Sequence, residues 1–172
     1  NADGPPPKPF RQITQADVEK GVLSNMTTPI ALIQGVIDGM VARRFGRIVN
    51  ITSGSVKSPI PGLDVSSGAR AGLTAFLAGP AREVAQANVT INNILPGQFE
   101  TDRLRGATAR MAEMRGVPVE EMTAQRRAAI PAKRFGDPRE FGQLCAYLAS
   151  AQAGYLTGQN FLIDGGLFPG AF

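Results

Sequence analysis

Two polar residues, Ser53 and Arg70, stand at the two ends of a segment that is rich in serine, glycine and proline. The segment connects a predicted strand, Arg47–Thr52, to a predicted helix that begins near Val65. Ligands of an open α/β sheet bind outside the carboxyl ends of its strands, so we expect the chemistry of this chain in this loop. A hydroxyl can hydrogen-bond a substrate oxygen, and a guanidinium can polarise one. The alternative for Ser53 is a serine that only satisfies backbone groups of the loop.

Composition limits which other side chains can take part. The chain of 172 residues has one cysteine and no histidine, which excludes zinc sites and Ser-His or Cys-His catalysis. Its 43% hydrophobic and 19% charged residues are typical of one globular domain over residues 1–172. No apolar run is long enough to span a membrane, and the first residues lack the order of a secretory signal. We therefore expect a cytoplasmic protein with no metal site and no membrane partner.

The net charge of +4 is concentrated in residues 100–134, which carry eight basic side chains against five acidic ones. Solvated helix faces are the simpler explanation, and a basic rim for an anionic substrate or acyl carrier is the alternative. No aromatic stacking pattern or recognition motif accompanies the charge, so we expect no binding to nucleic acid.

The elements that must position Ser53 and Arg70 follow from hydrophobic periodicity and cap signals. Thr14 and Asp17 resemble a capping box that opens a long amphipathic helix over Gln15–Arg44, with a kink expected at Pro29. The remaining predicted elements are a helix over Val65–Ala87 that bends at Pro80, a strand over Val89–Leu95, helices over Arg103–Arg115 and Pro118–Ala129, a helix capped by Asp137 that runs to Ser150, and a strand over Asn160–Ile163.

This alternation of helices and strands is typical of an α/β fold, a parallel sheet with crossover helices. Only about three strands are predicted, and parallel sheets are normally covered on both faces and at their edges. We therefore expect a truncated sheet whose N-terminal strands are missing, or one whose open edge another chain covers.

Five short motifs follow one another along nearly the whole chain: Asn1-Ala2-Asp3-Gly4, Leu23-Ser24-Asn25, Asn50-Ile51-Thr52-Ser53, Asn93-Ile94-Leu95-Pro96-Gly97 with Thr101, and Gly158-Gln159 with Asp164-Gly165-Gly166. Together they resemble the short-chain dehydrogenase/reductase family. The resemblance implies a Rossmann-like fold and an oxidoreductase that transfers a hydride between NAD or NADP and a carbonyl or hydroxyl substrate. Reductases of 3-oxoacyl thioesters are the nearest general type.

The resemblance also implies roles for individual residues. Ser53 takes the place of the catalytic serine, and Asn25 takes that of an asparagine that breaks its helix and holds a water. An asparagine in mid-helix is disfavoured, which independently supports a role for Asn25. The implied substrate loops fall in residues 100–134, and the implied dimer interface uses helices 15–44 and 65–87. The implied cofactor-binding residues are Asn1, Arg70, Pro96, Gly97, Phe99 and Thr101.

The catalytic pair departs from the family's Tyr-x-x-x-Lys. Counting from Ser53, the tyrosine falls on Ser66 and the lysine on Arg70. A serine hydroxyl is a weaker acid than a phenol and has a shorter reach, and an arginine does not relay a proton. Asp64 is an alternative acid or base, although a helix N-cap is the interpretation we prefer for it.

A second departure concerns the cofactor. The family's Thr-Gly-x-x-x-Gly-x-Gly turn has no counterpart in these 172 residues. We therefore expect that this chain by itself does not bind NAD(P) and is inactive. Three hypotheses stay open: an oxidoreductase for a small carbonyl or acyl-thioester substrate, seen without its N-terminal part; a non-catalytic oligomerisation or binding module; and a proteolytic fragment with no activity.

Overall fold

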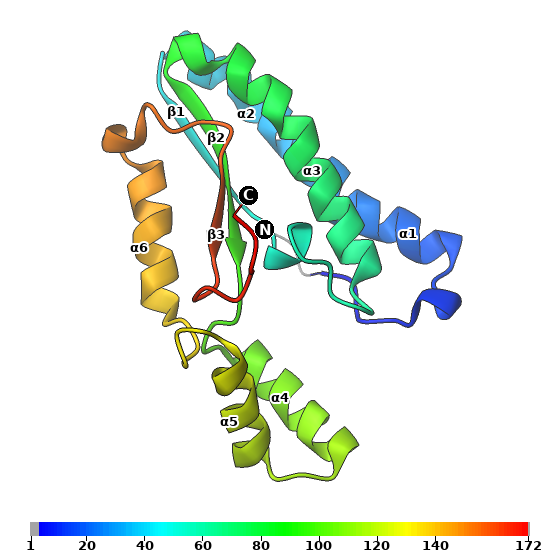
Figure 1. Ribbon diagram of the computed structural model, residues 1–172. Coiled ribbons are helices and arrows are strands. Elements are labelled where there is room, and N and C mark those ends of the chain that lie inside the picture. Colours follow the sequence, from blue (N-terminus) through cyan, green and yellow to red (C-terminus); the bar gives the residue numbers. More distant parts are fainter. Residues whose placement is uncertain (1–3, 172) are drawn as a thin grey trace.

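The computed structural model describes residues 4–171, in which three parallel strands lie side by side with helices on both faces (Figure 1). The strands are β1 (Gly46–Ile51), β2 (Val89–Pro96) and β3 (Asn160–Ile163), in the spatial order β1-β2-β3. This confirms the predicted α/β class with a parallel sheet.

Helices α2 and α3 cover one face of the sheet and α6 covers the other, while α4 and α5 extend beyond the carboxyl ends of the strands (Figure 1). The helices are α1 (Gln15–Val22), α2 (Thr28–Ala42), α3 (Asp64–Glu83), α4 (Asp102–Arg115), α5 (Val119–Ala129) and α6 (Pro138–Ala149), with a π-helix η2 (Leu23–Thr27) and short 3₁₀ turns η1 (Phe10–Gln12), η3 (Gly54–Val56), η4 (Ala85–Ala87) and η5 (Ala151–Ala153).

Strand β2 is the centre of the fold, because its residues Val89–Leu95 are buried on both faces. On the α2/α3 side its Ile91 packs against Leu73, Leu77 and Ala81 of α3 and Ile33 of α2. Full burial of one such side chain contributes about 1.5–3 kcal/mol. This packing fixes α3 over the sheet, and α3 carries Ser66 and Arg70.

Two predicted helix starts are confirmed in detail. The Thr14 hydroxyl accepts a hydrogen bond from the backbone N–H of Asp17, whose carboxylate accepts the N–H of Thr14 in return. Asp137 and Glu140 form the same reciprocal box at the start of α6, with Pro138 at the first helical position.

The predicted long helix is interrupted, but the interruption precedes Pro29. The π-turn of η2 lets the N–H of Thr28 donate to the carbonyl of Leu23, five residues back. Pro29 then lies in the first turn of α2, where its missing N–H costs nothing. The second predicted helix also ends early: Pro80 stays inside α3, which stops at Glu83.

Candidate active site

The ends of the three strands meet at one edge of the sheet. Ile51 is in register with Ile94, and the N–H of Thr52 continues the ladder to the Ile94 carbonyl at 2.9 Å. A Cβ on Gly54 would lie 3.3 Å from the carbonyl oxygen of Pro96, so the loop after β1 packs against the exit of β2. The sheet therefore brings the serine loop and the Pro-Gly segment together, as the motifs predict.

Arg70 crosses from α3 to the end of β1. Its Nη1 donates to the carbonyl of Ile51 at 3.0 Å, and its Nε donates to the hydroxyl of Ser66 at 3.2 Å. Burial lowers the pKa of the half-buried guanidinium, and the positive charge of Arg103 lowers it further. Arg70 is thus a fixed, partly desolvated cation that borders the loop.

The two serines use their oxygens as acceptors. Ser66 is buried and accepts from Arg70, whereas the half-buried Ser53 accepts from the backbone N–H of Ser55 at 3.1 Å. Ser53 therefore satisfies a backbone group of its own loop, as the alternative interpretation of this residue predicts. A hydroxyl that accepts one hydrogen bond still has its own O–H to donate, so both serines can serve a substrate oxygen.

Asn25 lies in the π-turn η2 and is 2% exposed. Its Nδ2 donates to the Ser24 hydroxyl at 2.7 Å. η2 packs on α3 so closely that a Cβ on Gly72 would lie 2.9 Å from the sulfur of Met26. The local break expected at Asn25 is therefore present, and π-turns of this kind are frequent at functional sites.

Three of the predicted cofactor residues lie at the exit of β2. Pro96 is the last residue of β2, and the N–H of Gly97 donates to the Ile163 carbonyl at 2.9 Å. A Cβ on Gly97 would lie only 2.7 Å from the Cβ of Asp164, so the close approach of β2 and β3 requires glycine. Thr101 caps α4 by accepting the N–H of Leu104. Asn1 lies outside the described residues.

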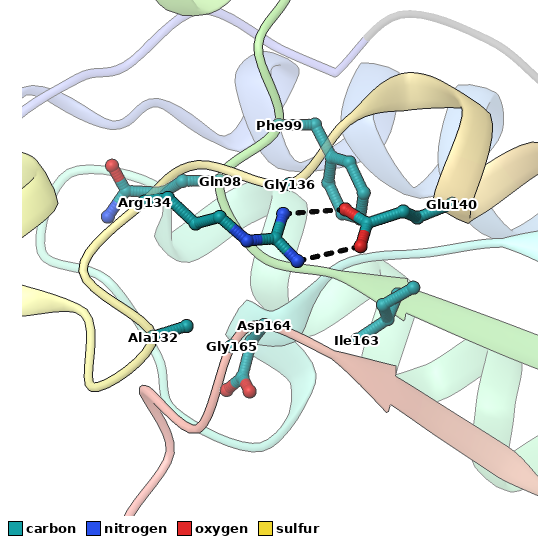
Figure 2. Close-up of a pocket in the computed structure, with 9 residues that line it drawn as sticks. All are labelled: Gln98, Phe99, Ala132, Arg134, Gly136, Glu140, Ile163, Asp164 and Gly165. Carbon is teal, nitrogen blue, oxygen red and sulfur yellow. Dashed lines mark hydrogen bonds and ion pairs between the residues drawn. The ribbon is translucent and has the colours of Figure 1, made fainter.

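Phe99, the remaining predicted cofactor residue, packs against α6. Its ring meets that of Phe141 edge-on, with centroids 5.6 Å apart. It lines a cavity of about 210 Å³, in which Arg134 and Glu140 form two ion-pair contacts of 2.7 Å (Figure 2). The hydrogen bond from Arg134 lowers the pKa of Glu140 to about 2, so this pair is charged and mutually neutralised at neutral pH.

An asparagine ladder that sequence reasoning missed crosses all three strands. Asn50, Asn93 and Asn160 share one register position. The Asn50 amide donates to Asn93 at 3.1 Å, and the Asn93 amide donates to Asn160 at 2.8 Å. The available signal was a polar amide inside each of three predicted strands, where asparagine is normally depleted. The ladder fixes the relative position of the strand ends.

Arg126 is a second residue that the sequence did not single out. Its Nε and Nη2 donate to Gln98 Oε1 at 3.1 and 2.9 Å, and its Nη1 donates to the Thr108 hydroxyl at 2.6 Å. Burial lowers its pKa. One side chain of α5 thereby connects α4 and α5 to the segment that follows β2.

Other arginines of residues 100–134 form ion pairs at the surface, which agrees with the simpler explanation of solvated helix faces. Arg105 pairs with Glu100 and Asp102, and Arg127 also pairs with Glu100. Arg103 differs, because its guanidinium lies beside Arg70 and Ser66. The sequence did not single out Arg103 from the other charged residues of this segment.

The other side chains that could act as an acid or a base are hydrogen-bonded to the backbone or lie away from this edge of the sheet. The N-cap of α3 is Leu63 and not Asp64, whose carboxylate accepts the N–H of Gly62. Tyr147 is near the end of α6 and Tyr155 precedes β3, so both belong to the opposite edge of the sheet. Within residues 4–171, no group of three or more histidine, cysteine or acidic residues could hold a metal ion. In the same range, no helix is long and apolar enough to cross a membrane.

Sequence comparison relates this chain to known enzymes. A family model described as enoyl-(acyl carrier protein) reductase matches residues 2–168. The chain is 36% identical to an acetoacetyl-CoA reductase of Cupriavidus necator over 161 residues, which is 94% of this chain and 61% of that protein. It is 34% identical to the 3-oxoacyl-[acyl-carrier-protein] reductase FabG of Vibrio cholerae, covering 84% of this chain and 55% of that protein. The chain therefore spans less than two thirds of these relatives.

Solved structures show the same relation. YwfH, an NADPH-dependent reductase involved in bacilysin biosynthesis, superposes with a TM-score of 0.92 at 28% identity, over 99% of this chain and 65% of that chain. An actinorhodin polyketide ketoreductase crystallised with NADPH gives a TM-score of 0.88 at 27% identity, over 97% of this chain and 65% of that chain. The sequence matches and the shared fold establish that the chain belongs to the short-chain dehydrogenase/reductase family.

Proposed function

We propose that the protein to which this chain belongs is an oxidoreductase that interconverts a carbonyl and a hydroxyl group with NAD or NADP. Its proposed substrate is a small carbonyl compound or a 3-oxoacyl thioester. The supporting observation is that Ser53, Arg70 and Gly97 converge at one sheet edge in a member of this family. A single domain over residues 1–172, substrate helices within 100–134 and a cytoplasmic location belong to the same proposal.

The residues of this chain suggest how the reaction proceeds. NAD(P), when bound, supplies or accepts the hydride. The hydroxyls of Ser53 and Ser66 donate hydrogen bonds to the substrate oxygen, and Arg70 stabilises the negative charge that develops there. Neither hydroxyl has a pKa matched to neutral pH, so the proton comes from water. We propose that Asn25, fixed in its π-turn, holds that water.

The nicotinamide half of a cofactor fits the residues present. Nη2 of Arg70 makes neither of the hydrogen bonds to Ile51 and Ser66, so it can serve a ribose hydroxyl. Pro96, Gly97, Phe99 and Thr101 flank the same edge. The glycine-rich turn for the adenosine half has no counterpart in the 172 residues. We therefore propose that NAD(P) binding needs that turn from a longer gene product.

Thermal unfolding in the presence of NADH and NADPH tests the cofactor proposal. A ligand at 100 times its Kd stabilises a protein by about 2.7 kcal/mol, which a melting curve resolves. We expect no shift for the 172-residue chain and a clear rise for a longer product that contains the turn. A rise with the 172-residue chain would show that the nicotinamide half suffices.

Reduction of acetoacetyl-CoA, followed through NADPH absorbance, tests the reaction in the longer product. The double substitution Ser66→Tyr and Arg70→Lys restores a phenol activated by an ammonium. We expect it to raise the rate by about 10²-fold, since general acid catalysis contributes 10² to 10⁴. A control with Ser66→Phe and Arg70→Lys lacks only the phenol oxygen and should show no gain. No gain in the tyrosine variant would mean that the site has diverged toward other work.

A non-catalytic oligomerisation role is the second candidate, supported by an apolar surface on α2 and α3. Leu32 is 67% exposed, Val36 47% and Phe76 48%, beside a groove of about 400 Å³ between the two helices. We propose that a second copy covers this surface through helices 15–44 and 65–87. Phe76→Glu should convert dimer to monomer in sedimentation velocity, while Tyr155→Glu, at a fully exposed site elsewhere, should not. A monomeric wild-type chain would contradict the proposal.

A further inference from the structure

α4 and α5 pack chiefly on each other and project beyond the carboxyl ends of the strands, where they form a helical hairpin (Figure 1). Backbone hydrogen bonds hold the base of this α4–α5 hairpin to the sheet edge. The N–H of Gly136 donates to the carbonyl of Gln98 at 2.9 Å, and the N–H of Ala132 donates to the carbonyl of Gly165 at 3.0 Å. A hairpin held at its base can still change its angle to the sheet, so that angle depends on contacts made farther along the helices.

Arg126, near the end of α5, makes such a contact. Its guanidinium donates to Gln98 Oε1 through Nε and Nη2 and to the Thr108 hydroxyl through Nη1. Thr108 is buried in α4 and donates its own O–H to the Leu104 carbonyl at 2.8 Å. The guanidinium carbon also lies 5.9 Å from the centroid of the buried Phe135 ring. One planar group therefore joins α5, α4 and the segment that follows β2.

The charge of Arg126 has no carboxylate partner among residues 4–171, where its hydrogen bonds go to an amide and a hydroxyl. Burial lowers its pKa, so the surroundings disfavour the charged form. An apolar side chain could join the same elements without desolvating a charge, so packing alone does not explain an arginine here. What a guanidinium adds is direction, because its planar fork fixes the geometry of every contact that it makes.

We propose that Arg126 is a positioning residue that fixes the angle of the α4–α5 hairpin against Gln98. Gln98 lies between Gly97 and Phe99, two of the proposed cofactor-binding residues. The hairpin contains the proposed substrate helices, so Arg126 sets where a bound substrate lies relative to the cofactor segment. The fixed angle itself does not depend on the proposed function, whereas the role in substrate binding rests on it.

Double electron–electron resonance between two spin labels tests the fixed angle in the 172-residue chain, without substrate or cofactor. One label is attached to Met114→Cys, which is 86% exposed near the end of α4, and the other to Tyr155→Cys, which is fully exposed before β3. Cys145→Ala removes the native thiol. We expect one narrow distance distribution in this background and a broader or displaced one after Arg126→Met.

Two further variants make this measurement decisive. Gln98→Met removes the acceptor from the other side of the contact and should broaden the distribution as Arg126→Met does, and the double variant should be no broader than either single one. Arg127→Met is the matched control. Arg127 is the next residue of α5, and its ion pair with Glu100 lies at the surface, where such pairs contribute little, so its loss should leave the distribution unchanged.

Substrate kinetics in a longer gene product test the role in binding, with acetoacetyl-CoA and NADPH. Loss of a charge-assisted hydrogen bond changes an equilibrium about ten- to hundredfold, and KM rises in inverse proportion to the binding-competent fraction. We expect Arg126→Met to raise KM about tenfold at nearly unchanged kcat, since Ser53 and Arg70 are untouched. Arg126→Lys keeps a donor for Gln98 and should restore part of the affinity. A residue that only stabilised the fold would lower kcat through the active fraction and leave KM unchanged.

An unchanged distance distribution in Arg126→Met and Gln98→Met, or equal broadening in Arg127→Met, would overturn the fixed angle. A lower kcat at unchanged KM in Arg126→Met would overturn its role in substrate binding. The proposed function fails separately. A longer product that oxidises no NADPH with any carbonyl substrate would refute that function, while broadening in the 172-residue chain would still support Arg126 as the residue that fixes the hairpin.

Discussion

Gly97→Ala tests whether the close approach of β2 and β3 holds the edge of the sheet together. The new Cβ would lie 2.7 Å from the Cβ and 2.8 Å from the Cα of Asp164, and backbone cannot move aside as a flexible side chain can. Overpacking of this kind costs about 1–3 kcal/mol. Separating the strands also weakens the 2.9 Å hydrogen bond from Gly97 to Ile163, worth about 1 kcal/mol. We expect a loss of about 2–4 kcal/mol in the free energy of unfolding.

Urea unfolding followed by circular dichroism measures this loss, and Gly142→Ala is the matched control. Gly142 lies inside α6, and a Cβ there would meet nothing within 4 Å. Alanine is favoured over glycine in a helix by about 0.5–1 kcal/mol, so this variant should be more stable than the wild type. Opposite signs for the same chemical change would support the steric argument. A Gly97→Ala variant as stable as the wild type would refute it.

Two further predictions concern α4, α5 and α6. Arg126→Met removes the hydrogen bonds to Gln98 and should accelerate amide hydrogen exchange in α4 and α5 about tenfold. Exchange in the sheet should stay unchanged. Equal acceleration throughout the chain would contradict a local stabilising role for Arg126. Glu140 has its pKa lowered from 4.5 to about 2 by Arg134, so it contributes stability above pH 4.5 that is lost as the pH falls toward 2. Thermal unfolding of the wild type and Glu140→Gln should therefore differ by a constant amount above pH 5 and converge near pH 2, and a difference that persists at pH 2 would exclude this linkage.

The fold was predictable from local signals because those signals are strong here. The β-branched run from Val89 reads as a strand, and the reciprocal caps at Thr14 and Asp137 mark helix starts that the structure confirms. The resemblance placed the helix break correctly at Asn25, whereas the proline signal placed it at Pro29, because a single proline predicts a break but not the side of the break on which the helix register changes. That choice depends on packing against α3, which no local pattern encodes.

The candidate site, too, was predictable only in part from the sequence. Ser66 and Arg70 are found by counting the family's motif from Ser53, and the structure places Arg70 in contact with Ser66 and with Ile51 at the end of β1. Arg103 and Arg126 reach their partners only because α4 and α5 turn particular faces toward the sheet edge. In the sequence both are members of a charged segment in which Arg105, Arg127 and Arg134 form surface ion pairs, and nothing in their spacing distinguishes them.

The structure also shows that Ser66 and Arg70, which replace the family's tyrosine and lysine, are not independent of each other. Ser66 and Arg70 are hydrogen-bonded to each other, and Arg70 is additionally fixed to the carbonyl of Ile51. A lysine ammonium has three N–H donors but no planar fork, so it would meet the serine and the carbonyl in a different geometry, and a tyrosine would replace the hydroxyl that accepts from Nε of Arg70. Changing either residue alone would therefore remove the hydrogen bond between them. Because the two side chains depend on each other in this way, the two positions are best tested together.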